Sequence, residues 1–134
     1  MAIEWTQDLA TGIDWQDNQH KELFKKIDSL MESMKVGKGK EEVENILNFL
    51  ADYVVVHFGN EEKAMEKFSY TEYSRHRAEH TKFTNDFSGL KKQVETAASP
   101  SILVIQIQRL VVDWLKNHIG KVDKSLGAFL KTKE

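Results

Sequence analysis

Apolar residues recur every three or four positions along most of this chain, which is the spacing of amphipathic α-helices. Four such stripes are separated by short breaks. The first predicted helix begins near Asp17 or Asn18, either of which can serve as an N-cap, and stops at the glycine-containing turn of residues 36–39. The second opens at Glu41, an acidic residue that suits a helix N-terminus, and fades near Phe68.

Short polar signals mark the starts of the next two helices. Ser69 and Glu72 have the spacing of a capping box and predict the start of the third helix. Ser99 as N-cap, followed by Pro100 at the first helical position, predicts the start of the fourth. Gly120 interrupts the fourth stripe, and we expect a short helical segment beyond it.

The pattern predicts an all-α fold. Residues 1–17 keep no period, and we expect an extended N-terminal arm held on the body by Trp5 and Trp15. Four long helices with short connections favour an up-down-up-down four-helix bundle over residues 18–131, with a short C-terminal helical segment. We therefore interpret residues 1–134 as a single domain.

Composition excludes several classes of function. The 134 residues suffice for one core, and a formal net charge of −2 without a basic run does not suggest a nucleic-acid binder. The chain contains no cysteine, which removes disulfides, thiolate metal sites and cysteine nucleophiles. We see neither a signal peptide nor an apolar run of about 20 residues that could span a membrane. We expect a cytoplasmic protein.

The chain's five histidines share one pattern, because each lies on an apolar stripe and all but His20 have a partner at short spacing. Spacings of three or four place side chains on one helix face. The starts of the first and third helices and the ends of the second and fourth meet at one end of such a bundle. We therefore expect seven polar side chains to converge there: His20, His57, Glu61, His76, His80, His118 and Asp123.

One of these spacings does not fit a regular helix. Five steps of about 100° leave His118 and Asp123 some 140° apart. We expect Gly120, between them, to let the helix end or loosen so that Asp123 swings back toward the cluster. A lone histidine on an apolar face is more often a hydrogen-bonded core residue, but five buried imidazoles without compensation would be costly.

The size of the donor set indicates two metal ions. Imidazole and carboxylate suit iron, zinc, copper, nickel and manganese. If both carboxylates and a solvent oxygen bridge the ions, the donors fill eleven of the twelve positions on two octahedral ions and leave one position open. For zinc, which prefers four ligands, the same set contains too many donors. Two irons with one open position suit a small diatomic ligand.

The surroundings of the set favour binding over catalysis. All the histidines are used as ligands, so none remains as a general acid or base, and no recognisable nucleophile motif is present. We expect an apolar pocket wall, and a dry wall favours reversible binding because it limits proton supply. The residues expected in the wall are Phe24, Phe58, Trp114, Leu115 and Ile119.

Four segments carry a resemblance to a known family. They are D-N-Q-H-K-E-L-F at 17–24, H-F-G-N-E-E-K-A-M at 57–65, H-R-A-E-H-T-K-F at 76–83 and W-L-K-N-H-I-G-K-V-D-K at 114–124. With them the chain resembles the hemerythrin family, and in particular its single-domain bacterial members. The one visible departure lies in the turn before the third helix, where many relatives have Tyr-Pro and this chain has Tyr-Thr.

The resemblance implies a non-haem di-iron centre with an oxo or hydroxo bridge that binds dioxygen reversibly, end-on at the open iron. It also implies how the ligands are divided. One iron would be held by His76, His80 and His118, the other by His20 and His57, and both would be bridged by Glu61 and Asp123.

We therefore expect a non-enzymatic oxygen carrier that serves storage, transport or delivery, most simply as a monomer that supplies an oxygen-consuming enzyme. Three alternatives stay open: an oxygen or redox sensor, a di-iron oxidase, peroxidase or nitric-oxide-handling protein, and an iron-handling or structural bundle. Sensor members of the family are usually fused to signalling domains, for which this length leaves no room.

Overall fold

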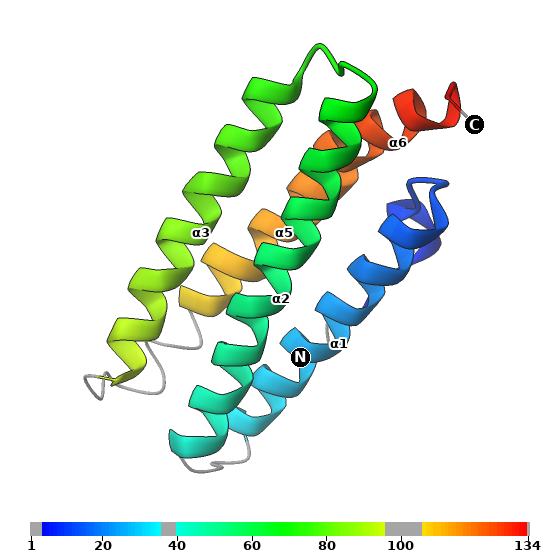
Figure 1. Ribbon diagram of the computed structural model, residues 1–134. Coiled ribbons are helices and arrows are strands. Elements are labelled where there is room, and N and C mark those ends of the chain that lie inside the picture. The colour runs from blue at the N-terminus through cyan, green and yellow to red at the C-terminus, as the bar shows by residue number, and fades with distance from the viewer. Residues whose placement is uncertain (1–3, 36–39, 96–105, 134) are drawn as a thin grey trace.

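The computed structural model describes residues 4–35, 40–95 and 106–133, and within them every regular element is helical (Figure 1). In chain order the elements are η1 (Gln7–Leu9), α1 (Asp14–Lys35), α2 (Lys40–Lys67), α3 (Tyr73–Glu95), η2 (Gln108–Asp113), α5 (Trp114–Asn117), η3 (His118–Asp123) and α6 (Lys124–Lys131). The first is a 3-10 turn, and η2 and η3 are π-helical.

Three long helices and a C-terminal helical run form a four-helix bundle, as the hydrophobic pattern predicts. α1 packs against α2, α2 against α3, and α3 against η2. The elements from η2 to α6 follow one another without a break in helical backbone, so together they make the fourth helix. The predicted start of that helix at Ser99 and Pro100 lies outside the described residues.

α1 begins at Asp14, so the prediction of a helix start near Asp17 or Asn18, with an arm reaching residue 17, is wrong. The Asp17 carboxylate binds back to the preceding turn, accepting hydrogen bonds from the Thr11 backbone N–H and hydroxyl, both at 2.8 Å. Gly12 allows that turn because its φ is +86°. Trp15 therefore belongs to the helix, while Trp5 packs on the core as expected.

The turn between α2 and α3 also differs from its prediction. Ser69 has φ +55° and ends α2 in a left-handed conformation. Its N–H donates to Glu66 and that of Tyr70 to Met65, the pair of bonds that defines a Schellman motif. Ser69 thus terminates α2 instead of capping α3, so the predicted capping box with Glu72 does not form.

The interior of the bundle is filled by apolar side chains from all four helices, and each large one stabilises the fold by about 1.5–3 kcal/mol. Among those at most 1% exposed are Leu23, Phe24, Ile27, Leu30, Leu47, Leu50, Phe83, Leu90, Ile107 and Leu115. Across the described helices, none combines the length and apolar character needed to cross a membrane.

The N-terminal arm, residues 4–13, closes over the C-terminal run. A Cβ atom built on buried Gly127 would lie 2.6 Å from the Thr11 carbonyl oxygen, so only glycine allows α6 to approach the arm this closely. Lys124 donates to the Asp8 carbonyl at 2.9 Å. These contacts hold the arm against α6.

Candidate metal centre

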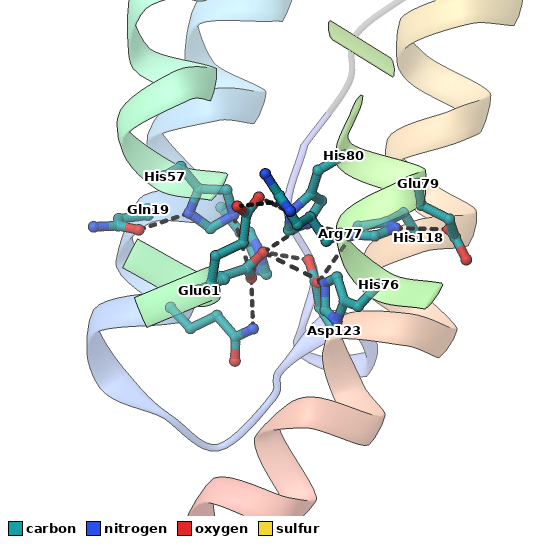
Figure 2. A network of polar contacts seen from close by, with 12 residues as sticks. Gln19, His57, Glu61, His76, Arg77, Glu79, His80, His118 and Asp123 are labelled. Carbon is teal, nitrogen blue, oxygen red and sulfur yellow. Dashed lines mark hydrogen bonds and ion pairs between the residues drawn. The ribbon is translucent and has the colours of Figure 1, made fainter. Parts of the chain in front are cut away.

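All seven side chains singled out in the sequence meet inside the bundle. Figure 2 labels all of them except His20. They come from α1, α2, α3 and η3, and none is more than 2% exposed. They form two overlapping groups that share both carboxylates, with donor atoms in each group within 4.8 Å of one another. The larger group is Glu61, His76, His80, His118 and Asp123, and the smaller is His20, His57, Glu61 and Asp123.

Glu61 turns one carboxylate oxygen to each group. Its Oε1 lies 3.1 Å from His80 Nε2 and 3.7 Å from His76 Nε2. Its Oε2 lies 3.4 Å from His57 Nε2 and 3.6 Å from His20 Nε2. A carboxylate that divides its oxygens in this way is arranged to bridge two cations.

Asp123 repeats the arrangement from the opposite helix. Its Oδ1 lies 2.9 Å from His76 Nε2 and 3.0 Å from His118 Nε2. Its Oδ2 lies 2.9 Å from His20 Nε2. Both carboxylates therefore present one oxygen to the three-histidine group and one to the two-histidine group.

The spacing of two imidazole nitrogens, those of His80 and His118, fits two neighbouring donors on one cation. His80 Nε2 and His118 Nε2 are 3.2 Å apart. Carboxylate oxygens of Glu62 and Glu79 face the Nδ1 atoms of these rings, so in the neutral imidazoles Nδ1 carries the proton and each Nε2 a lone pair. Neighbouring donors on an octahedral ion with bonds of about 2.1 Å lie about 3.0 Å apart, close to this spacing.

The π-helix η3 accounts for the irregular spacing of five. In a π-helix the hydrogen bonds run from i to i+5, so His118 and Asp123 lie on the same side of the helix. The helix loosens between them, as predicted, but it does not end. Gly120 is not required by crowding, since a Cβ there would meet only Leu9 Cδ2 at an ordinary 3.8 Å.

Three residues outside the ligand set contact the Nδ1 atoms of the imidazoles and orient the rings, and none of them was predicted from the sequence. Gln19 Oε1 lies 2.6 Å from His57 Nδ1. Glu62 and Glu79 carboxylate oxygens lie 3.0 Å from Nδ1 of His80 and His118, respectively. Such partners fix the ring orientation and leave Nε2 free for a metal. Each lies next to a candidate ligand in the sequence. The histidine that it contacts, however, lies on another helix, so only the packing of the helices shows which two residues meet.

A fourth missed residue is Gln16, whose side chain is completely buried. Its Nε2 donates to Glu61 Oε2 at 2.6 Å. Gln16 precedes His20 by four residues, so the same helical spacing that linked the histidines could have placed it at the site.

The imidazoles and carboxylates of the cluster shift one another's pKa values. Burial lowers the pKa of His20, but hydrogen bonds and charges from Asp123 and Glu61 outweigh it and raise the pKa to about 9. The same balance raises the pKa of His76 to about 9. Burial dominates at His57 and lowers its pKa to about 4. Burial opposes ionisation of both carboxylates, yet the imidazoles hold their pKa values below the usual range.

Aromatic rings close the wall of the centre. Phe58 stacks on the His80 ring with centroids 3.8 Å apart and planes 2° from parallel. Trp114 stacks on the His118 ring at 4.4 Å and 11°. These contacts bear out the predicted wall position of both rings. The other expected wall residues, Phe24, Leu115 and Ile119, are each 1% exposed or less.

Comparison with known proteins gives a consistent result. A family model described as the hemerythrin HHE cation binding domain matches residues 11–130. The bacteriohemerythrin of Methylococcus capsulatus is 36% identical over 129 residues, 96% of both chains. The hemerythrin-like protein of Naegleria gruberi is 30% identical over 90% of this chain and 87% of its own. A crystal structure of wild-type hemerythrin is 34% identical and superposes with a TM-score of 0.84, covering 96% of this chain and 97% of that one.

Proposed function

Because this chain belongs to the hemerythrin family, we propose that it holds two iron ions and binds dioxygen reversibly. His76, His80 and His118 would hold one iron, and His20 and His57 the other. Glu61 and Asp123 would bridge the two. When bound, a pair of ferrous ions supplies two electrons and an open coordination position, which reversible dioxygen binding requires.

The observation that carries this proposal is the division of the carboxylate oxygens. Oε1 of Glu61 and Oδ1 of Asp123 face the three-histidine group, whereas Oε2 and Oδ2 face the two-histidine group. A single ion would need only one such set of donors. The unequal numbers of imidazoles support placing the open position at the ion of His20 and His57.

The protein's own residues prepare the centre for this role. Gln19, Glu62 and Glu79 hold three imidazoles with Nε2 turned inward. Phe58 and Trp114 cover the three-histidine group with stacked rings. A wall of this kind limits water and proton supply, which favours release of an unchanged ligand over its reduction.

The cellular role belongs to the same proposal. We favour a non-enzymatic carrier that stores, transports or delivers oxygen, as a monomer in the cytoplasm, to an oxygen-consuming enzyme. That residues 1–134 make a single domain also stays a prediction.

Reversibility can be tested directly. Metal-free protein is loaded with ferrous iron without oxygen, and its visible spectrum is followed through cycles of oxygen admission and removal. We expect a band that appears with one dioxygen per two irons and vanishes on removal. Immediate, irreversible oxidation would contradict a carrier and favour an oxidase. His57→Ala should lose the band, and its survival in that variant would contradict the ligand assignment.

A further inference from the structure

Gln16 is a polar side chain inside the candidate centre that none of the roles above uses. It lies in the first turn of α1, one helical turn before His20, and its side chain is 0% exposed. Its Nε2 is 2.6 Å from Glu61 Oε2, the oxygen that also faces His20 and His57. Gln16 therefore approaches the two-histidine group and not the three-histidine group.

The direction of the amide follows from chemistry. An ionised carboxylate can only accept hydrogen bonds, so the amide must turn its N–H toward Glu61 and its carbonyl oxygen away. The 2.6 Å contact between Gln16 Nε2 and Glu61 Oε2 has this direction, with the amide N–H as donor and the carboxylate oxygen as acceptor. The orientation of Gln16 is thus fixed by its partner.

The remaining atom of this amide has no partner. Gln16 Oε1 is buried and accepts no hydrogen bond from any residue that the structure describes. The oxygen and nitrogen of one amide are about 2.2 Å apart, so Oε1 lies within about 5 Å of Glu61 Oε2. A buried acceptor without a donor is costly, which indicates that something at this position supplies one.

We propose that Gln16 is a specificity-determining residue, whose carbonyl oxygen accepts a hydrogen bond from a proton-bearing ligand at the ion of His20 and His57. Its N–H fixes Glu61 at the same time. The carbonyl oxygen of Gln16 then gives the two-histidine side of the pocket one hydrogen-bond acceptor. This acceptor favours ligands with an N–H or O–H group over ligands without one. This inference rests on the proposed function, since it needs an ion at that position.

Two probes separate this role from a merely structural one. Deprotonated cyanamide and cyanate are linear anions of similar size and equal charge, but only cyanamide carries an N–H. Each is titrated at one pH against air-oxidised, iron-loaded protein and followed by its visible spectrum. Iron is counted in every sample.

The variants are Gln16→Met, with Gln16→Leu as a second test, and Gln106→Met as the matched control. Gln106 also has a buried amide oxygen without a partner in the described part of the chain, but it lies twelve residues before His118, roughly 18 Å along the helix. We expect both Gln16 variants to bind cyanamide about 3- to 10-fold more weakly relative to cyanate. Gln106→Met should bind both as the unchanged protein does.

Each outcome bears on the inference in a distinct way. An unchanged ratio of the two affinities in Gln16→Met, with two irons bound, would overturn it. Loss of one iron in both Gln16 variants would also overturn it, because Gln16 would then act on metal retention. Fewer than two irons in the unchanged protein would instead contradict the proposed function itself.

Discussion

Removing the carboxylate of Glu79 tests whether outer residues tune the three-histidine group. Glu79 Oε1 lies 3.0 Å from His118 Nδ1, and its side chain is 33% exposed. Loss of such a partner typically weakens metal binding 10- to 100-fold. Because water can reach this position and replace the lost oxygen, we expect Glu79→Ala to fall near the lower limit, about 10-fold or 1.4 kcal/mol.

The assay is a competition at pH 7 between the protein and a coloured chelator for cobalt(II), which is stable in air and resolves two binding steps. Asp86→Ala is the matched control, because it removes the same charge from α3 about 10 Å further along the helix. In the described part of the chain Asp86 forms an ion pair with exposed Lys82, at 3.0 Å, so both binding steps should stay within about twofold of those of the unchanged protein.

The two cobalt-binding steps should respond differently to variants on the two sides of the centre. Glu79→Ala should weaken one binding step and leave the other unchanged, and Gln19→Ala should weaken the other step, because Gln19 orients His57. If Glu79→Ala binds cobalt as Asp86→Ala does, the carboxylate does not act through His118 and the reasoning fails.

Four further results are expected. Gly127→Ala should lower the free energy of unfolding by about 1–3 kcal/mol, because its Cβ would meet the arm's backbone. Gly89→Ala, whose Cβ would have nothing within 4 Å, should raise the free energy of unfolding by about 0.5–1 kcal/mol. Equal effects of the two variants in urea unfolding would count against the arm's close packing. Metal loading at pH 7 should release at least two protons in a pH-stat, since His20 and His76, with pKa values of about 9, must lose theirs to bind metal, and the raised pKa of His118 adds to the release. Without metal, protonated His20 and His76 stabilise the fold through their contacts with Asp123 and Glu61. This contribution to the free energy of unfolding should be complete below about pH 6.5 and should disappear as the pH rises through 9. Glu61→Ala should leave fewer than two irons per chain by elemental analysis, and two would contradict bridging.

The sequence predicts the bundle and the membership of the cluster because both depend on helical periodicity. His76 and His80 share a face by spacing alone, and His20 and His57 fall at the same end once the helices alternate in direction. The convergence of all seven side chains follows from the order of the helices.

Features that depend on a few backbone angles were harder to predict. Ser69 matches a capping box by residue type, but in the structure it terminates the preceding helix at φ +55°. Asp17 is a suitable N-cap, yet its carboxylate folds back on Thr11 and allows the helix to begin at Asp14. Residue preferences at helix ends overlap, so the local competition decides.

The outer partners could not be read from one helix at a time. Glu79 lies on α3 and orients a histidine on η3, while Glu62 lies on α2 and orients one on α3. Each looks like an ordinary half-exposed charge in its own helix. The π-helical turn at His118 was anticipated as loosening, but its form follows only from the backbone.

The most direct test of the account is a crystal structure of the iron-loaded protein with anomalous scattering recorded at the iron edge. We predict two iron peaks inside the bundle, with Glu61 and Asp123 each contacting both, three histidines on one ion and two on the other. A single peak, no peak, or irons bound away from these seven side chains would contradict the central claim.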